Sequence, residues 1–248
     1  MAAAKRPPWL LALGRQAPPE EVQLGQAIYR LEEVFKHDFF AFTGRYGGPE
    51  GRVVVKLGRS ASFFGFPLAW VGRLLARRER QVFERLAGLE VVPAFTGAVG
   101  ANGISHSFVD GAVLRRGAPG VPDDFFARLR TGVDSIHARG VAIVDLEKPE
   151  NVLLGEDGRP YLFDFQISHY GSPQRPGWLL NYLQDADHYH VLKLQRRVRP
   201  DQLDAETLRS ARRRPRLIQL YGKLTRPIIR LRRRCLARVY SRRQNSSA

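Results

Sequence analysis

Apolar and turn-forming residues are arranged differently in the two halves of the sequence, and this difference restricts the possible folds. Up to about residue 110, short runs rich in β-branched and aromatic residues are separated by turn residues, as at 47–51 before the run 52–58. The stretch 74–89 interrupts them with helical spacing and has Gly88 near its end. After residue 110 the spacing is mostly helical. The sequence therefore predicts an α+β fold.

The composition of the chain suggests four segments. Residues 1–20, rich in Ala and Pro, are expected to form a loose leader, and residues 21–110 a small antiparallel β-sheet with one helix. Residues 111–206 are expected to form a reduced, largely helical lobe, and 207–248 a basic tail. A β-rich lobe followed by a helical lobe implies a cleft between them.

The formal net charge of +16 is concentrated in the tail. Residues 207–248 hold fourteen Lys and Arg and no Asp or Glu, which leaves 26 basic and 24 acidic residues in the preceding 206. The pattern predicts a basic amphipathic helix interrupted by Pro227, suited to an anionic membrane surface, to packing on the helical lobe or, less favoured, to nucleic acid. Its apolar stripe comprises Leu217, Tyr221, Leu224, Ile228, Leu231, Cys235 and Val239.

Cysteine usage and hydropathy bear on where the chain works. Cys235 is the single cysteine, so no internal disulfide and no thiolate metal site can form. No apolar run approaches the roughly 18–20 residues that a membrane span needs, and the apolar stretch after Lys5 and Arg6 is too short for a signal peptide. We expect a cytoplasmic protein that can associate peripherally with the inner face of the plasma membrane.

Three polar residues near two short strand-like segments suggest a metal site. Asn151 and Asp164 sit on these two segments, and the turn at 155–159 between them would bring both residues close together. A carboxylate and an amide oxygen suit Mg²⁺, and Asp145, a few residues upstream, could accept a proton from a hydroxyl group. Aspartates near turns also serve as ordinary turn residues.

The order of the polar residues resembles the protein-kinase superfamily. The segment 53–56 resembles the strand that ends in the phosphate-binding lysine, and Glu79 resembles the helix residue that pairs with it. Later in the chain, 109–114 resembles the hinge, 135–146 the entry to the catalytic loop, and 164–166 the Asp-Phe-Gly motif. The likeness covers roughly residues 28–190 and implies a bilobal protein-kinase-like fold that uses ATP and Mg²⁺.

The resemblance also implies a role for each residue. Lys56, held by Glu79, would neutralise nonreacting phosphates of ATP, while Asn151 and Asp164 would hold Mg²⁺. Asp145 would position and deprotonate the acceptor hydroxyl, and Lys148 could contact the transferred phosphoryl group. The alternatives are an exposed strand lysine at 56 and a solvated helix glutamate at 79.

The catalytic loop departs from the kinase pattern in two places. Ile143 and Val144 stand where the family has His and Arg, which argues against switching by a phosphorylated loop. Six steps separate Asp145 from Asn151 where the family has five, so the extra residue must bulge between them. Glu147 is the second candidate for the proton acceptor if that bulge displaces Asp145.

Two further departures affect the phosphate-covering turn and the segment after Asp164. No glycine-rich loop precedes Lys56 at the expected distance. In the turn at 34–40, Lys36 and His37 could supply charge to the phosphates instead, or this could be an ordinary solvated turn. Gln166 replaces the glycine of Asp-Phe-Gly, and no Ala-Pro-Glu segment follows. Asp187 could support the catalytic loop from a helix, or cap that helix.

These reductions resemble small atypical bacterial kinases, a group that includes the lipopolysaccharide core (Kdo or heptose) kinases and RIO-like serine/threonine kinases. The resemblance implies an ATP- and Mg²⁺-dependent kinase whose acceptor is a hydroxyl of a glycolipid sugar or of a protein Ser or Thr. The alternative is a pseudokinase that binds nucleotide, partners or membrane without phosphoryl transfer. The quartet 148–151 favours a serine/threonine kinase.

Overall fold

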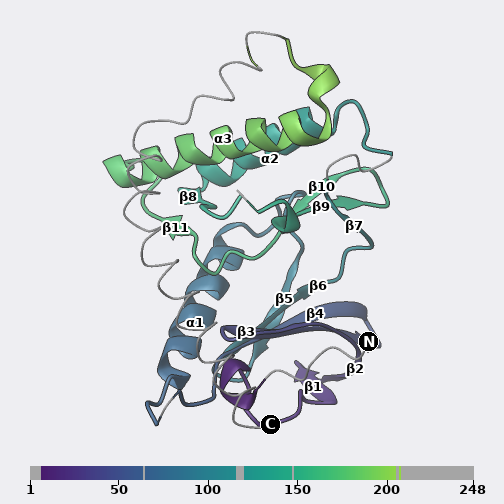
Figure 1. The fold of residues 1–248 in the computed structure, drawn as a ribbon, viewed down its shortest axis with the longest axis vertical. Coiled ribbons are helices and arrows are strands. Elements are labelled where there is room, and N and C mark those ends of the chain that lie inside the picture. Colours follow the sequence, from purple (N-terminus) through teal and green to yellow (C-terminus); the bar gives the residue numbers. More distant parts are fainter. Residues whose placement is uncertain (1–6, 64, 116–119, 147, 205–206, 208–248) are drawn as a thin grey trace, which may run out of the picture. The chain divides into compact units, whose positions relative to one another are not determined.

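The computed structural model describes residues 7–63, 65–115, 120–146, 148–204 and 207. Residues up to Arg199 form one unit, and a second unit begins at Pro200. Within the first unit, strands dominate the first part of the chain and helices the later part, as the sequence predicts (Figure 1). No helix in the described part of the chain is both long enough and apolar enough to cross a membrane.

A six-stranded antiparallel sheet forms most of the first lobe, with strand order β1-β2-β3-β4-β6-β5. The turn between β3 and β4 is a tight hairpin in which Gly48 pairs with Gly51, and Gly51 has a φ of +104° that favours glycine. The strands are β1 (Glu21–Leu24), β2 (Ala27–His37), β3 (Ala41–Gly48), β4 (Gly51–Gly58), β5 (Phe95–Val99) and β6 (Gly103–Ser107).

One helix, α1 (Ala69–Arg85), is inserted between β4 and β5 and contacts both strands. It begins five residues earlier than the apolar spacing predicts and ends before Gly88, whose φ of +82° stops a helix. Val82 and Phe83 on its buried face belong to the main hydrophobic core. That core also contains Leu129 and Val133 of the second lobe, so α1 packs against residues from both lobes.

The second lobe contains two long helices, α2 (Phe125–Ala138) and α3 (Trp178–Val198), which lie side by side (Figure 1). Gly140 ends α2, because its φ is +71° and its N–H bonds to the His137 carbonyl. Short strands form two small sheets, one of β7 (Gly111–Val113), β9 (Val152–Gly155) and β10 (Pro160–Leu162), the other of β8 (Val141–Ala142) and β11 (His169–Tyr170). Three short 3-10 helices complete the elements: η1 (Pro8–Leu10), η2 (Pro149–Asn151) and η3 (Pro200–Gln202).

The segment expected to be a loose leader is packed against the sheet from residue 7 onward. Ala12 and Leu13 are buried, and the Tyr46 hydroxyl donates to the Pro19 carbonyl at 2.7 Å. The guanidinium of Arg59, itself 3% exposed, donates to the carbonyls of Trp9 and Leu11. A buried cation needs such acceptors, so this arginine orders a segment that has no apolar periodicity.

The basic tail lies outside the described residues from 208 onward, so its predicted amphipathic helix stays a prediction.

Candidate active site

The register of β2, β3 and β4 aligns two lysines on one face of the sheet. Lys36 pairs with Thr43, and Thr43 pairs with Lys56, so the three residues form one cross-strand row. Two strand spacings separate the lysine positions, about 10 Å in all. Lys36 and Lys56 therefore face the same region.

His37 lies on the other face of the sheet. It pairs with Phe42, its Nε2 accepts the Leu13 N–H at 3.3 Å, and its ring meets Phe42 edge-on at 5.7 Å. Successive side chains of a strand point to opposite faces, so Lys36 and His37 cannot both face Lys56. His37 therefore does not lie beside Lys56, as the predicted phosphate-binding role would require, and the role of Lys36 stays a prediction.

Lys56 contacts two carboxylates, one from its own lobe and one from the second lobe. Its Nζ lies 2.9 Å from Glu79 Oε1 of α1 and 2.5 Å from Asp164 Oδ1, which follows β10 in the second lobe. The side chains of Lys56 and Glu79 are 14% and 3% exposed. The structure thus places all three predicted residues together, and we call them the lysine–carboxylate triad.

Burial and charge act in opposite directions within this triad. Burial alone would lower the pKa of Lys56, but Glu79 and Asp164 outweigh it and raise that pKa above its ordinary value. Burial raises the pKa of Glu79, although Lys56 opposes the rise. Burial also acts to raise the pKa of Asp164, but Lys56 overcomes it and lowers that pKa, with help from Lys36 and Lys148. Three lysines thus act on one carboxylate.

The residue after Asp164 fixes this carboxylate relative to α1. Phe165 is fully buried, its ring meets Phe83 edge-on at 5.3 Å, and its backbone bonds to the Glu79 carboxylate. Asp164 has a φ of +68°, an uncommon conformation for a residue with a side chain. Packing of its neighbour therefore holds Asp164 in a backbone geometry that directs its carboxylate to Lys56.

The loop before Asp145 is held by a buried aspartate on α3. Asp187 is fully buried, and its carboxylate accepts the N–H of Ile143 at 2.7 Å and that of Val144 at 2.9 Å. Val144, with a φ of +71°, and Asp164 are the two non-glycine residues of positive φ within the described chain. Asp187 therefore supports the loop that leads to Asp145, in agreement with one of its two predicted roles.

Asp145 and Asn151 lie in the loop that this support positions. Lys148 Nζ is 2.5 Å from Asp145 Oδ2, and Asn151 Nδ2 donates to the Asp145 carbonyl at 3.1 Å. Because Nδ2 is used in this way, Oδ1 of Asn151 is left for a ligand. The predicted proton acceptor, lysine and amide ligand are thus adjacent.

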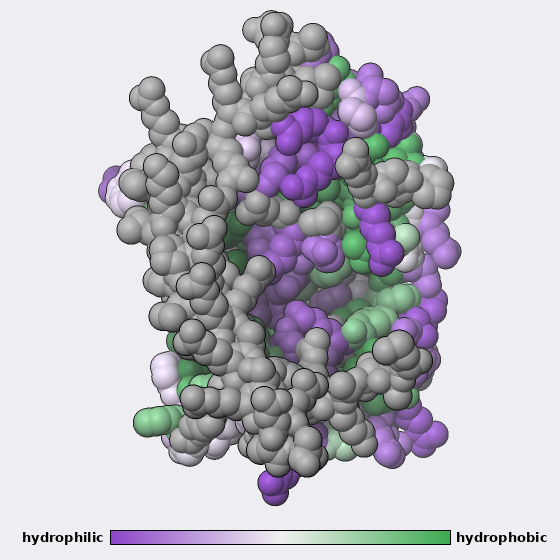
Figure 2. Space-filling view, in the orientation of Figure 1, coloured by the Kyte–Doolittle hydropathy of each residue, from purple (hydrophilic) through white to green (hydrophobic). Residues whose placement is uncertain are grey.

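Pairing of β9 with β10 brings Asn151 and Asp164 to the same end of a hairpin. Val152 pairs with Leu162, so Asn151 comes directly before this pair and Asp164 two residues after it. Figure 2 shows a recess with hydrophilic side chains between the β-rich and helical parts of the described chain. The hairpin therefore brings the two predicted magnesium ligands to one end of the small sheet, as the sequence suggests.

Two successive turns accommodate the extra residue of the loop. The Lys148 N–H bonds to the Asp145 carbonyl at 3.2 Å, and the Asn151 N–H bonds to the Lys148 carbonyl at 3.1 Å. Glu147, the second candidate proton acceptor, lies outside the described residues.

Ser168, which the sequence did not single out, donates to the Ile143 carbonyl at 3.2 Å. It sits four residues after Asp164, without a motif that would identify it.

Comparison with known proteins supports the fold. No protein-family model and no curated protein matches the sequence. Two crystal structures of the Rio2 kinase from Chaetomium thermophilum match the chain at 16% identity. An ADP/Mg²⁺-phosphoaspartate complex gives a TM-score of 0.53 over 72% of this chain and 61% of that chain. A second structure gives 0.51 over 68% and 58%.

The chain thus spans about 60% of the length of the Rio2 structures it matches. A likeness at this identity shows the fold, so the predicted bilobal protein-kinase-like α+β fold is confirmed.

Proposed function

We propose that this chain is an ATP- and Mg²⁺-dependent kinase that transfers a phosphoryl group to a hydroxyl acceptor. The observation that carries the proposal is the lysine–carboxylate triad, in which Lys56 joins Glu79 to Asp164 of the other lobe. Buried charge clusters with shifted pKa values are typical of functional sites. The Rio2 structure with ADP and Mg²⁺ supports the proposal through its shared fold.

The residues of the site fit a magnesium–nucleotide complex. Asp164 accepts Lys56 through Oδ1, which leaves Oδ2, and Asn151 has Oδ1 available. These are the hard oxygen donors that Mg²⁺ prefers, and it would supply charge stabilisation between the phosphates. Lys56 and, more weakly, Lys36 would face the same phosphates, because both lie in one row of the sheet.

The acceptor hydroxyl would meet Asp145. Its carboxylate can accept the hydroxyl proton and hold the oxygen in line with the phosphorus, while Lys148 neutralises charge beside it. Asp187 keeps this carboxylate in place through the Ile143 and Val144 amides. Alignment and charge stabilisation are the main requirements of phosphoryl transfer, so this small set is sufficient.

A lipopolysaccharide core sugar or a protein Ser or Thr is the proposed acceptor, and the cytoplasmic face of the membrane the proposed location. The basic tail supports this location by its composition, since each cation near an anionic surface contributes about 1 kcal/mol. Flotation with anionic liposomes would compare the full chain with a chain ending at residue 206. Equal binding by both would remove the tail from the proposal.

A pseudokinase is the second candidate, and the turn between β2 and β3 favours it. This turn, Asp38 to Phe40, has no glycine, and Lys36 is paired with Asp38 at 2.9 Å. Such a turn offers fewer backbone amides to phosphates than a glycine-rich loop. On this alternative the chain would bind nucleotide or membrane without positioning the phosphates for transfer.

Phosphoryl transfer by the purified full-length chain separates the two candidates. We expect Mg²⁺-dependent transfer from ATP to lipopolysaccharide core oligosaccharide or to a Ser/Thr peptide, and its loss in Asp145→Asn. Asp157→Asn, in the exposed turn between β9 and β10, is the matched control and should keep the native rate. Tight Mg²⁺-ATP binding without turnover would establish the pseudokinase instead.

A further inference from the structure

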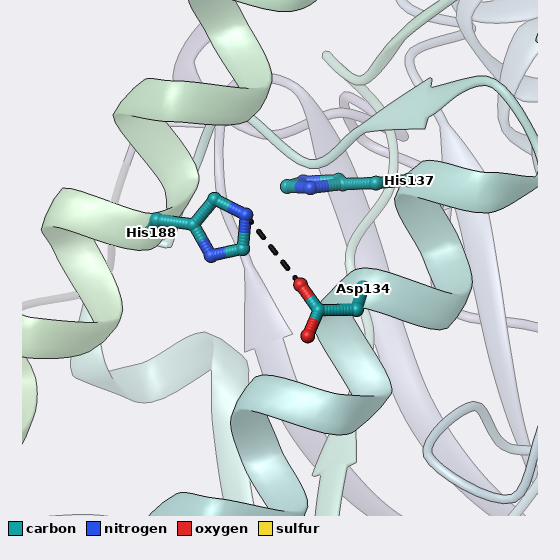
Figure 3. Close-up of side chains that lie close together, drawn as sticks. All are labelled: Asp134, His137 and His188. Atoms are coloured by element: carbon teal, nitrogen blue, oxygen red, sulfur yellow. Dashed lines mark ion pairs between the residues drawn. The ribbon is translucent and has the colours of Figure 1, made fainter.

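A second group of ligand-type side chains lies on α2 and α3, apart from the residues assigned to phosphoryl transfer. Asp134 and His137 are three residues apart on α2 and share one face of the helix. His188 approaches them from α3 (Figure 3). Each of the three offers one ligand atom, and these atoms lie within 4.8 Å of one another.

The spacing of these side chains is close to that of a metal-binding site. His188 Nε2 and Asp134 Oδ1 are 3.5 Å apart. Two ligands of a tetrahedral zinc ion, each about 2.0–2.1 Å from it, are separated by about 3.3 Å. The rings of His137 and His188 meet edge to face with centroids 4.9 Å apart. The side chains of His188 and Asp134 are 45% and 63% exposed, so small rotations can bring their ligand atoms closer.

One ring nitrogen of His137 has a carboxylate partner, as in many metal-binding histidines. Its Nε2 lies 3.1 Å from Oδ2 of the buried Asp187. Both oxygens of Asp187 accept backbone N–H groups, so Nε2 of His137 must be the donor in this contact. The lone pair of neutral His137 is then on Nδ1. Metal-binding histidines commonly donate their other ring N–H to a carboxylate in this manner.

We propose that Asp134, His137 and His188 bind a divalent first-row transition metal ion such as Zn²⁺, with water in the remaining positions. Two imidazoles and one carboxylate suit zinc and its neighbours, whereas Mg²⁺ prefers oxygen ligands alone. This site is therefore chemically distinct from the Asn151 and Asp164 pair, and it does not depend on phosphoryl transfer. The exposure of two ligands gives the ion access from solvent.

The position of the proposed site connects it to the catalytic loop. The ion would bind His137, His137 bonds to Asp187, and Asp187 holds the amides of Ile143 and Val144. These amides directly precede Asp145. Zinc binding should therefore slow hydrogen exchange at the two amides more than at the amides of β1, which lies in the other lobe.

Calorimetric titration of Zn²⁺ into the tag-free, metal-stripped full-length chain tests the site. We expect one ion per chain, and at least ~100-fold weaker binding in His188→Ala and in Asp134→Asn, since even supporting residues of such sites matter 10- to 100-fold. The matched controls are Asp185→Asn on α3 and His169→Ala on β11, which should bind as the native chain does.

Absorption spectra with Co²⁺ provide a second measurement. We expect d–d bands without a thiolate charge-transfer band, because the ligands are nitrogen and oxygen and Cys235 takes no part. No stoichiometric binding, or equal binding by the native chain and both ligand variants, would mean that Asp134 and His188 form only a surface ion pair. Bound zinc with uniform exchange at 143–144 and in β1 would overturn the connection to the catalytic loop.

Discussion

Two lysines in one row of the sheet lie in contrasting surroundings. Lys56 on β4 is 14% exposed and contacts carboxylates from two lobes, whereas Lys36 on β2 is 59% exposed and pairs with Asp38, two residues along the chain. Exposed local pairs contribute little to stability, while a buried cation depends on its partners. The same residue type is therefore a fixed part of the structure at position 56 and an adjustable charge at position 36.

Substitution of Lys56 should have the largest effect on the rate of phosphoryl transfer. Lys56→Met would leave Asp164 and Glu79 without their shared cation, and we expect kcat for phosphoryl transfer to fall by about 10²–10³, as for other preorganised charges. Initial rates at saturating ATP measure it. Retention of the native rate would show that Lys56 is only structural.

The buried partner of Lys56 should matter for stability. Glu79→Gln removes a charged acceptor from Lys56 and from the Phe165 backbone, and we expect a loss of about 2 kcal/mol in unfolding free energy by urea denaturation. Glu84→Gln, in an exposed pair with Arg80 on the same helix, is the matched control and should change stability by less than about 0.5 kcal/mol. Equal losses would remove the distinction between buried and exposed pairs.

The sequence predicts part of the contrast between Lys56 and Lys36. The resemblance of the motif order to protein kinases placed Lys56, Glu79 and Asp164 together, while hydrophobic patterns and turns predicted the strands and the helix that carry them. The sequence could not assign Lys36 and His37 to faces, because β2 has register shifts near Leu31 and near Val34 that interrupt simple alternation.

Contacts between distant segments were also beyond the sequence. The ordering of residues 7–20 depends on the buried guanidinium of Arg59, which donates to carbonyls about fifty residues away. The grouping of Asp134 with His188 depends on how α2 packs on α3. An Asp and a His three residues apart are a weak signal without that packing.

The folding stability of the protein should also depend on pH, through a histidine packed against α1. Burial lowers the pKa of His106, which stacks on Phe83 of α1, to about 4. Below pH 6.5 the unfolded chain binds a proton at this residue and the folded chain does not until about pH 4, so stability falls as the pH falls. We expect a loss of about 1.4 kcal/mol per pH unit in this range.

His106→Gln isolates this contribution. Urea denaturation of both proteins between pH 7 and 4 should give a shallower pH dependence for the variant. Parallel curves would contradict the assignment to His106.

Substitution of Lys36 should have the smallest effect on the kinetics of phosphoryl transfer. Lys36→Met should raise KM for ATP only a few-fold with little change in kcat, since an exposed charge about 10 Å from Lys56 acts through solvent. Steady-state kinetics at low and high salt test it, and the effect should shrink with salt. An effect as large as that of Lys56→Met would overturn the contrast between the two lysines.

On the proposed function, the lysine–carboxylate triad and Asn151 form a magnesium–nucleotide site. Thermal unfolding with ATP and Mg²⁺, with ATP and EDTA, and without ligand tests it on the native chain, Asp164→Asn and the control Asp157→Asn. At a ligand concentration of 100 Kd, binding should stabilise the native chain and the control by about 2.7 kcal/mol, with Mg²⁺ required. Asp164→Asn should lose the Mg²⁺-dependent part. Absence of this stabilisation in the native chain, or its persistence in Asp164→Asn, would show that Asp164 does not hold Mg²⁺ at a nucleotide site.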